Sequence, residues 1–595
     1  MHELQFPFDT EYLMSNKRRI KKTLLLEKSD FIEIKVAILG GSTTVAIKDM
    51  LELFLLNYGI NAIFYESEYS QYYEDAIFSN SKLDELQPDI VYLCTTIRNI
   101  INVPSMADTK ERVDAWISSI ENQYVSMWDM ISQRYSCAII QNNFEMPDYR
   151  ILGNYDAVNF HGMTNIVNRL NTWFVEEISK RDNLYLCDIN YIAADCGLQK
   201  WHDAVVWYMY KYAIGLEAIP TLAFNVANII KSIYGKSKKG FVLDLDNTLW
   251  GGVIGDNGQD GIELGPETSL GQAYVDYQRY LKKHKEIGVV LNINSKNEMD
   301  NALLGLNHPD SQLSQEDFVV IKANWESKDV NFISIASALN ILPESLVFVD
   351  DNPAERMIVS EQIKDAAVPN IGKVTDYIRV LDRNAFFEVV SLSQDDSKRN
   401  VMYKENADRA KLQMSFKNYS EYLQALEMKA TIKPFEEIYM GRIVQLINKS
   451  NQFNLTTKRY TLPQIEHIAK SYNEYITLYG KLEDKFGDNG VVSLVIGKII
   501  ADRCEIQLWL MSCRVLRREM ECAMMDCFVD ECKKRNVSHI IGVYIPTTKN
   551  KLVKNFYGER GFSLITKNQD GNSSWLLDLT KGYTLQNRNI KIGER

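Results

Sequence analysis

The sequence predicts a multidomain α/β protein, and three observations lead to this prediction. The chain has 595 residues, which suits about three or four domains of roughly 150 residues each. Short apolar segments alternate with helical stretches up to about residue 385, a pattern typical of parallel sheets covered by helices. From about residue 429 strands and helices are mixed, which predicts an α+β domain there.

The first predicted domain spans residues 1–235. Its expected strands are the apolar runs at 34–41, 88–96, 136–143 and 183–190, each followed by a helical stretch. The polar, basic run KSKKG at 236–240 reads as a junction. We therefore expect a doubly wound α/β domain that ends at this junction.

Three further regions follow the junction. Residues 236–385 repeat the strand–helix alternation, with strands expected within 240–250, 288–297, 317–324 and 345–353. Residues 386–428 are charged and show no clear strand, so we expect helices that link two domains. Residues 429–595 have expected strands at 475–482, 490–500, 504–516 and 539–546, with a helix near 517–535.

Composition narrows the classes of function. The chain is 46% hydrophobic and has a formal net charge of −11, which disfavours general binding to nucleic acid. No apolar run reaches the roughly 18–20 residues that a membrane helix needs, and the beginning MHELQFPFDTEYL has no signal-like segment. The nine cysteines form no CxxC pair, so a zinc site is disfavoured and a reducing compartment is expected. We expect a cytoplasmic protein without nucleic-acid or membrane partners.

Two carboxylates, Asp244 and Asp246, follow the apolar strand GFVL. The carboxyl ends of strands are where open α/β sheets place their sites. One carboxylate can attack phosphorus, and the other can protonate the leaving oxygen and later activate water. A lone DxD pair could equally be a surface turn, so the prediction depends on the residues that follow.

Those residues supply the other parts of a phosphoryl-transfer site. Ser295 ends a strand and can donate to a phosphoryl oxygen, and Lys328 offers a fixed positive charge. A group of carboxylates needs a counter-cation, for which Mg²⁺ with oxygen ligands is the natural candidate. The predicted metal ligands are Asp244, Asp246, Asp350 and Asp351, and the predicted catalytic residues are Asp244, Asp246, Ser295 and Lys328. Thr248 and Asn297 are candidate substrate-binding residues.

These motifs closely resemble the signature of haloacid-dehalogenase (HAD) phosphatases. The segments at 244–258, 293–298, 324–332 and 347–356 are similar to the FkbH-like branch of that superfamily (subfamily IIIC). The resemblance implies a Mg²⁺-dependent enzyme that uses a phosphorylated three-carbon acyl donor, commonly 1,3-bisphosphoglycerate. It further implies removal of phosphate and loading of the glyceryl unit onto the phosphopantetheine thiol of an acyl carrier protein, for polyketide or glycan biosynthesis.

The C-terminal region resembles a GNAT-type acyltransferase in the strings at 508–525, 544–550 and 555–562. Its turn at 516–520 has no glycine, so close backbone approach to a CoA pyrophosphate is disfavoured and a carrier-bound pantetheine arm fits better. Cys513 is the predicted acyl-accepting thiol, because the neighbouring arginines would favour a thiolate; a buried structural cysteine is the alternative. Arg514 and Asn454 are candidate substrate-binding residues.

The N-terminal region resembles SGNH hydrolases more loosely. Gly40-Gly41-Ser42 follows a strand, and Ser42 is either a nucleophile or a helix N-cap. Asn143 is a candidate oxyanion donor and His202 a candidate base, but Gln199 stands where the aspartate of such a triad is expected. We therefore expect a degenerate hydrolase-like site used for docking or for holding substrate.

Three functions remain open at this stage. The leading one is transfer of a glyceryl-type unit to a carrier thiol with dephosphorylation. The second is a HAD phosphatase coupled to acylation of an amino sugar or another amine. The third is a phosphatase whose flanking domains bind a carrier without catalysis.

Overall fold

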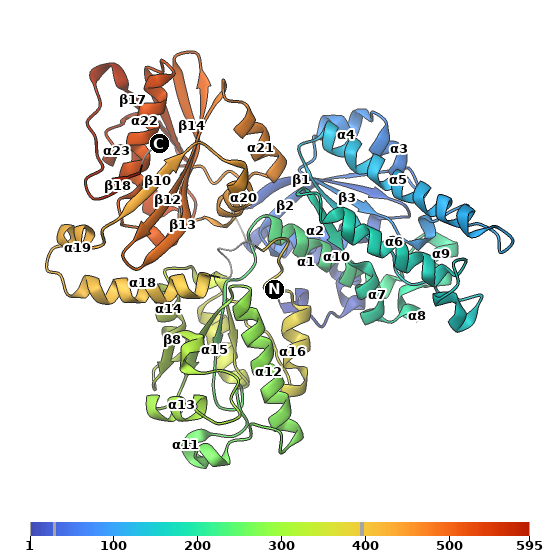
Figure 1. The fold of residues 1–595 in the computed structure, drawn as a ribbon. Coiled ribbons are helices and arrows are strands. Elements are labelled where there is room, and N and C mark those ends of the chain that lie inside the picture. Colours follow the sequence, from blue (N-terminus) through green and yellow to red (C-terminus); the bar gives the residue numbers. More distant parts are fainter. Residues whose placement is uncertain (1, 28–30, 393–397, 594–595) are drawn as a thin grey trace. The chain divides into compact units, whose positions relative to one another are not determined.

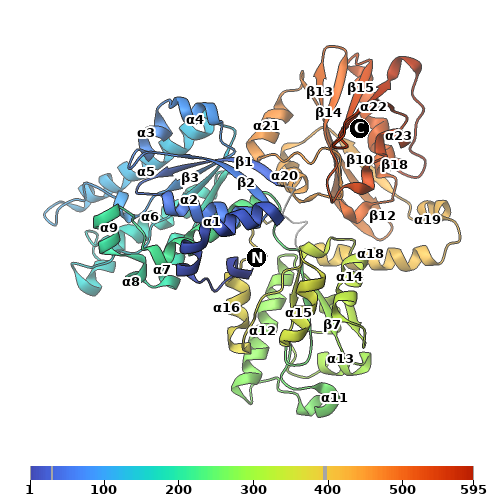
Figure 2. The ribbon, with the colours of Figure 1, turned by 180° about the vertical axis from the view of Figure 1, so that it is seen from behind.

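The computed structural model describes residues 2–27, 31–392 and 398–593 (Figures 1 and 2). Contacts divide the chain into two units. Unit 1 contains Met1–Tyr234 and Tyr460–His467, and unit 2 contains Gly235–Arg459 and Ile468–Arg595. The predicted multidomain α/β class is confirmed. Among the described residues, no helix has the length and apolar character needed to cross a membrane.

Unit 1 is built on a five-stranded sheet with the order β2-β1-β3-β4-β5, in which all neighbouring strands are parallel. The strands are β1 (Ile32–Gly40), β2 (Ile60–Glu66), β3 (Ile90–Cys94), β4 (Ala138–Asn142) and β5 (Leu184–Cys187). The three inner strands, β1, β3 and β4, are mostly buried, as a sheet covered on both faces requires. Strand β5 ends at Cys187, because the next residue, Asp188, caps the helix that follows by accepting from the Tyr191 N–H.

Helices pack in two groups in unit 1. One group contains α1 (Thr10–Glu27), α2 (Val45–Asn57) and α10 (Ile219–Ile233). The other contains α3 (Tyr72–Ile77), α5 (Lys110–Arg134) and α6 (Met163–Ile178). Short helices complete the unit: α4 (Ser81–Leu86), α7 (Ile189–Cys196), α8 (Leu198–Trp201) and α9 (Ala204–Tyr210). Both groups lie against the sheet in Figure 1.

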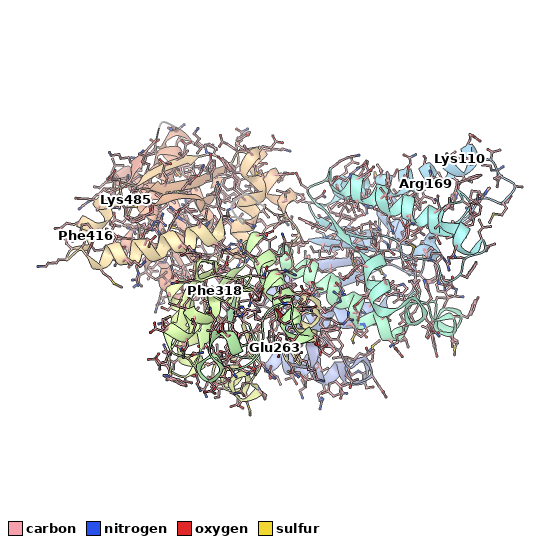
Figure 3. The ribbon with its side chains drawn as sticks, turned by 60° about the horizontal axis from the view of Figure 1, so that its bottom comes forward. Lys110, Arg169, Glu263, Phe318, Phe416 and Lys485 are labelled. Carbon is pink, nitrogen blue, oxygen red and sulfur yellow. The ribbon has the colours of Figure 1, made fainter. Side chains whose placement is uncertain are left out.

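The first sheet of unit 2 has four parallel strands in the order β8-β7-β6-β9. They are β6 (Gly240–Leu243), β7 (Val290–Ser295), β8 (Phe318–Ala323) and β9 (Leu346–Val349). Phe318, labelled in Figure 3, is buried in the core beneath this sheet. The covering helices are α12 (Ser269–Glu286), α13 (Met299–Leu306), α14 (Lys328–Ala338), α15 (Pro353–Gln362) and α16 (Val374–Arg383), with the short α11 (Ile254–Asn257) near the first loop.

Two helices, α18 (Arg399–Met414) and α19 (Tyr419–Ala425), lie in the stretch where linking helices were predicted. Residues 393–397 of that stretch lie outside the described part of the chain. Arg399 and Asn400 at the start of α18 donate to carbonyl oxygens at 285–289, so the helix begins against the four-stranded sheet's own domain.

The second sheet of unit 2 is mixed, with the order β16-β17-β15-β14-β13-β12-β10-β18 and with β11 paired to β14. Its strands are β10 (Lys429–Lys433), β11 (Phe453–Asn454), β12 (Tyr475–Asp484), β13 (Gly487–Ile500), β14 (Arg503–Met511), β15 (His539–Tyr544), β16 (Ser563–Lys567), β17 (Ser573–Asp578) and β18 (Lys591–Ile592). The helices are α20 (Met440–Lys449), α21 (Leu462–Lys470), α22 (Met520–Lys534) and α23 (Phe556–Glu559).

The strand predicted at 504–516 ends earlier, at Met511, because residues 513–515 form a short 3-10 turn. Helix α22 also begins later than predicted, since Arg517 and Glu519 both have positive φ. Beyond their four paired residues, β14 and β15 separate, and the chain around Leu455 lies between them. The Leu455 N–H donates to the Trp509 oxygen (3.0 Å), and the Leu455 oxygen accepts from the Ile545 N–H (2.9 Å).

Candidate active site

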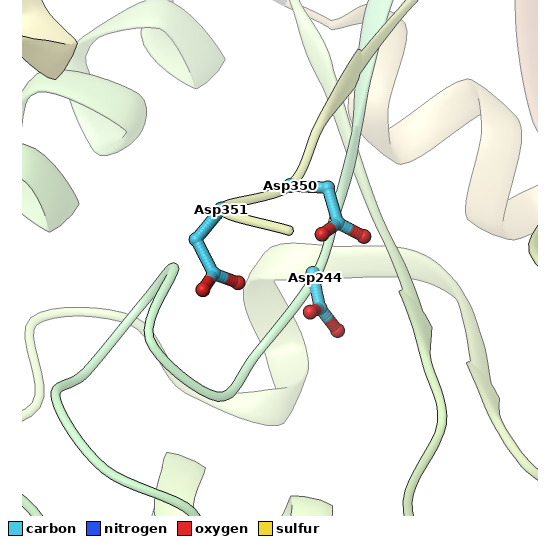
Figure 4. A group of neighbouring side chains, drawn as sticks. All are labelled: Asp244, Asp350 and Asp351. Atoms are coloured by element: carbon cyan, nitrogen blue, oxygen red, sulfur yellow. The ribbon is translucent and has the colours of Figure 1, made fainter. Parts of the chain in front are cut away.

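Three carboxylates meet at the carboxyl edge of the four-stranded sheet. Asp244 follows β6, and Asp350 and Asp351 follow β9, which is the neighbouring strand. The Asp244 N–H donates to the Val349 oxygen (3.0 Å), so both strand ends are held side by side. Each residue offers one carboxylate oxygen, and these oxygens lie within 4.8 Å of one another (Figure 4). Parallel strands end at one edge of a sheet, which is why residues about a hundred positions apart converge.

Lys328 provides the cation at this cluster. It is the first residue of α14, and its Nζ lies 2.9 Å from Asp244 Oδ1 and also donates to Asp350 Oδ2. Burial by itself would lower the pKa of Lys328, but the charges of Asp244 and Asp350 raise it above its usual value. The backbone at Lys328 is fixed by the buried Asn294, whose Nδ2 donates to the Lys328 oxygen (2.8 Å).

The carboxylate pKa values show how crowded the negative charge is. Burial first, and the charge of Asp244 second, raises the pKa of Asp350 to about 6. The same two causes raise the pKa of Asp351. One lysine therefore does not neutralise three carboxylates, and a divalent cation with oxygen ligands fits the donor set of Asp244, Asp350 and Asp351.

The Asp246 carboxylate lies outside that three-residue group. Its Oδ1 accepts from Trp250 Nε1 (2.9 Å) and from the Ile254 N–H (3.1 Å), and its Oδ2 accepts from Asn297 Nδ2 (3.0 Å). Burial raises the pKa of Asp246. Because neutral donors already hold both oxygens, this placement suits proton transfer and does not suit the metal-ligand role that we predicted for Asp246.

The remaining predicted residues of this domain have structural partners. Thr248 is buried, and its Oγ1 accepts from the Asp351 N–H (3.1 Å), so it ties the two loops together. Asn297 is the donor to Asp246. Ser295 is the last residue of β7 and is buried at the same sheet edge. Thr248 and Asn297 therefore order the loops around the carboxylates.

Sequence reasoning missed several residues that hold the first loop. Asn247 has φ +57°, and its oxygen accepts from the hydroxyls of Tyr274 (3.2 Å) and Tyr377 (3.1 Å). Gly251 and Glu263, the latter labelled in Figure 3, exchange backbone hydrogen bonds of 3.0 and 2.8 Å. Gly251 did carry a sequence signal together with Trp250, because both belong to the Trp250-Gly251-Gly252 step of the segment 244–258.

Cys513 begins the 3-10 turn after β14 and is half-buried. It packs beside an apolar cluster that includes Phe348 and Tyr403, and its oxygen accepts from Asn340 Nδ2 (2.5 Å). Asn340 precedes β9, so Cys513 lies toward the amino edge of the four-stranded sheet, whereas Asp244 lies at the carboxyl edge. The four residues of β6 alone separate these edges by about 13 Å.

Two of the three arginines that follow Cys513, Arg514 and Arg518, are engaged within unit 2. Arg518 is buried and pairs with Asp484 (3.1 Å), and burial lowers its pKa to about 10. Its guanidinium is therefore occupied within the domain and is not available to the phosphate of an incoming ligand. Arg514 donates to Ser512 Oγ (3.3 Å) and also contacts Met402 Sδ.

Asn454 is fully buried in β11. Its Oδ1 accepts from the Thr457 N–H (2.8 Å), and its backbone oxygen accepts from Asn550 Nδ2 (2.9 Å). The polar groups of Asn454 are thus used within the sheet.

The N-terminal candidates do not form a triad among the described contacts. Asn143 donates to Asp188 (2.7 Å), and His202 Nε2 lies 2.8 Å from the Met146 oxygen. Ser42 is buried and is not the N-cap of α2, which is Thr44. Thr43 is bound by the end of α9, since its N–H donates to the Lys211 oxygen (3.0 Å) and its Oγ1 to the Tyr210 oxygen (2.8 Å).

Comparisons with known proteins agree with this fold. Residues 35–231 match the family model described as FkbH, N-terminal domain. A crystal structure of the N-terminal part of the protein BF1531 from Bacteroides fragilis, described as containing a phosphatase domain complexed with Mg, is 27% identical. The match covers 63% of this chain and 99% of that one, with a TM-score of 0.59. No curated protein matches the sequence.

Solved acetyltransferases match a quarter of the chain at low identity. The ribosomal-protein-S18-alanine N-acetyltransferase of Escherichia coli is 14% identical over 25% of this chain and 90% of its own, with a TM-score of 0.19. An N-acetyltransferase from Thermoplasma acidophilum is 12% identical over 25% of this chain and 99% of its own, with a TM-score of 0.21.

The parallel sheet and its carboxylate edge define a phosphatase domain of the HAD type, and the chain is an enzyme of that class. Residues 35–231 match the FkbH N-terminal family model, and the similar solved structure contains a phosphatase domain, so the predicted resemblance to FkbH-like HAD proteins is confirmed.

Proposed function

We propose that this enzyme transfers a glyceryl-type acyl unit from a phosphorylated three-carbon donor to the thiol of an acyl carrier protein. Phosphate is removed at the Asp244 site. The observation that carries the proposal is the convergence of Asp244, Asp350 and Asp351 on Lys328 at one sheet edge. The FkbH-like resemblance supplies the donor class, for which 1,3-bisphosphoglycerate is the reference compound.

Mg²⁺ is the proposed cofactor. Asp244, Asp350 and Asp351 would hold it, and the similar BF1531 fragment was crystallised with Mg. Bound Mg²⁺ would neutralise negative charge on the carboxylates and on the phosphoryl group. Lys328 holds a second positive charge against the nucleophile, so the anionic ligand meets a site that is not itself strongly negative.

Asp244 is the proposed nucleophile for dephosphorylation. Its carboxylate oxygen forms a bond to the phosphorus of the donor's phosphate ester while the bond from that phosphorus to the ester oxygen breaks, so the acyl phosphate at the other end of the donor is kept for transfer. Asp246, whose pKa is raised by burial, gives its proton to the departing oxygen. Water then attacks phosphorus, Asp246 takes a proton from it, and inorganic phosphate leaves with both carboxylates restored.

The acyl group moves in a separate exchange. A thiolate attacks the carbonyl carbon of the acyl phosphate, the carbon–sulfur bond forms, and the phosphate leaves with the electrons of the carbon–oxygen bond. The carrier thiol then displaces the first thiolate, giving the glyceryl thioester of the carrier. Cys513 remains the proposed first thiol. Since it lies toward the other edge of the sheet from Asp244, the donor or its product must move between the two places.

The proposed domain roles follow the four predicted segments. Residues 236–385 carry dephosphorylation, and residues 429–595 form a GNAT-like domain for transfer to the carrier. Residues 386–428 link these two. Residues 1–235 form an SGNH-like domain that docks a partner or holds substrate, because the contacts of Asn143 and His202 do not assemble a hydrolase triad with Ser42.

Mass spectrometry of a carrier protein tests the proposal. The full-length enzyme is incubated with Mg²⁺, 1,3-bisphosphoglycerate and a phosphopantetheinylated acyl carrier protein. We expect a glyceryl mass gain on the pantetheine arm, and none on the carrier that lacks the arm. An unmodified arm with active, phosphate-releasing enzyme would contradict transfer to the carrier.

A second function is favoured by the distance between Cys513 and Asp244. A HAD phosphatase that acts on a carrier-bound phosphorylated group needs no thiol of its own, and its flanking domains would then only bind the carrier. A thioester trapped on Cys513 supports the first function. Release of phosphate from a carrier-bound substrate with no enzyme thioester supports the second.

A further inference from the structure

Arg356 bridges the two consecutive acidic residues at the end of β9. It lies in the first turns of α15, and its Nη1 donates to the backbone oxygens of both Asp350 and Asp351, each at 2.7 Å. Its Nη2 donates to Asn370 Oδ1 (3.1 Å). The guanidinium thus binds the backbone of two proposed ligands and leaves their carboxylates to face Asp244.

This contact matters because of local backbone geometry. Successive side chains of an extended chain point to opposite sides, so two adjacent aspartates converge only where the chain turns between them. One nitrogen that holds both carbonyl oxygens fixes that turn. Arginine suits the role because its planar fork binds in a fixed direction, whereas lysine carries a single flexible ammonium group.

A second set of bonds secures the same turn from the other side. The Asn352 N–H donates to Asp350 Oδ1 (2.9 Å), and the Asn352 side chain caps α15 through the Ala354 N–H (2.9 Å). Asn352 therefore orients one carboxylate, while Arg356 sets the backbone from which both carboxylates project.

We propose that Arg356 is a positioning residue for the divalent cation, acting through the backbone of Asp350 and Asp351. The inference rests on the proposed Mg²⁺ site. Partners in the outer shell of a metal site commonly change metal affinity about 10–100-fold when they are replaced. We expect replacement of Arg356 to change the Mg²⁺ affinity by a factor in this range. This is expected although, among the described residues, the Arg356 side chain donates to backbone oxygens of the proposed ligands and to no ligand carboxylate.

Calorimetric titration of Mg²⁺ into the full-length protein without substrate tests this inference. Arg356→Lys keeps the charge but loses the fork, and we expect it to raise the Mg²⁺ dissociation constant by about 10-fold or more. Excess Mg²⁺ is expected to restore phosphate release, which a general folding defect would not allow. Arg279→Lys is the matched control, because Arg279 is exposed and pairs with Asp276 on α12 (3.0 Å); its affinity should equal that of the unmodified protein.

The outcomes separate cleanly. A folded Arg356→Lys variant with unchanged Mg²⁺ affinity overturns the inference and leaves the Mg²⁺ site standing. If Arg356→Lys does not fold, Asn370→Ala decides, since it removes only the anchor of Nη2; we expect weaker binding there, and unchanged binding overturns the inference. Absence of Mg²⁺ binding by the unmodified protein overturns the proposed function, and this inference with it.

Discussion

Lys328 Nζ lies 2.9 Å from Asp244 Oδ1 and simultaneously donates to Asp350, so one buried ammonium faces two carboxylates. With Asp351 in the same group, the site holds three acidic side chains against that one cation. The excess of negative charge is what a divalent ion would relieve, and it makes the stability of this domain depend on metal.

Removing metal is therefore expected to destabilise the protein. Mg²⁺ at about 100 times its dissociation constant should add about 2.7 kcal/mol of stability, so the melting temperature in Mg²⁺ should exceed that in a chelator. Asp351→Asn should reduce this difference, and Asp276→Asn, at an exposed position on α12, should not. Equal shifts in both variants would argue against Asp351 as a ligand. Differential scanning fluorimetry measures the melting temperature of the unmodified protein and of both variants, each in Mg²⁺ and in a chelator.

The indole of Trp250 is expected to support catalysis through Asp246. Trp250→Phe keeps most of the buried ring but loses the 2.9 Å bond to Asp246 Oδ1. Because Asp246 is protonated when it acts as the acid, the bond contributes about 0.5–1.5 kcal/mol, so phosphate release should slow by about 2–10-fold. Trp325→Phe is the control, because the exposed Trp325 donates instead to Glu298 (2.7 Å). Comparable losses in the two variants would refute a specific role for Trp250.

The sequence was sufficient to predict the multidomain α/β architecture and the convergence of the three carboxylates. Asp244, Asp350 and Asp351 each follow a strongly apolar strand, and strand order in a parallel sheet brings such ends together. Motif spacing could not separate Asp246 from them, because its partners Trp250 and Asn297 come from two different loops. That separation depends on loop conformations that only the folded chain defines.

The C-terminal region was harder to predict from the sequence for the same reason. Local sequence placed Cys513 beside three arginines, but the long-range pairing of Arg518 with Asp484 removes one of them from the surface. Likewise, Asn454 was predicted as a candidate substrate-binding residue, yet its segment forms β11 and pairs with β14. Contacts between residues 30 to 60 positions apart have no signature in a single sequence.

Asp484 is expected to be a stability determinant of the C-terminal domain. Its side chain is fully buried and pairs with Arg409 (2.7 Å) and Arg518 (3.1 Å). Asp484→Asn would leave the buried Arg518 without its ion pair and the buried Arg409 with Glu405 alone (3.4 Å), at a cost of about 3–5 kcal/mol. Thermal unfolding of this variant should show a clearly lower midpoint temperature than that of the unmodified protein. The adjacent Glu483→Gln breaks only an exposed pair with Lys429 and should change stability by less than about 1 kcal/mol. A similar effect of both changes would contradict this ranking.

Cys513→Ala is expected to abolish carrier loading while sparing phosphate release. The two activities use different groups, and Cys513 lies toward the amino edge of the sheet that carries Asp244 at its carboxyl edge. Intact-protein mass spectrometry of the carrier measures loading, and a phosphate assay on a small phosphomonoester, which has no acyl phosphate, measures dephosphorylation separately. Cys196→Ala, at another half-buried cysteine, should leave both steps unchanged. Normal loading by Cys513→Ala would place the acyl-accepting thiol elsewhere.

Phosphate release by the Asp244→Asn variant tests the central claim most directly. The change preserves size and removes the nucleophile, so the folded variant in Mg²⁺ should lose about 10³-fold or more of the rate. Circular dichroism confirms the fold, and Asp276→Asn, at an exposed position, should retain full activity. Rapid phosphate release by folded Asp244→Asn protein would mean that the carboxylate cluster after β6 and β9 is not the phosphoryl-transfer site.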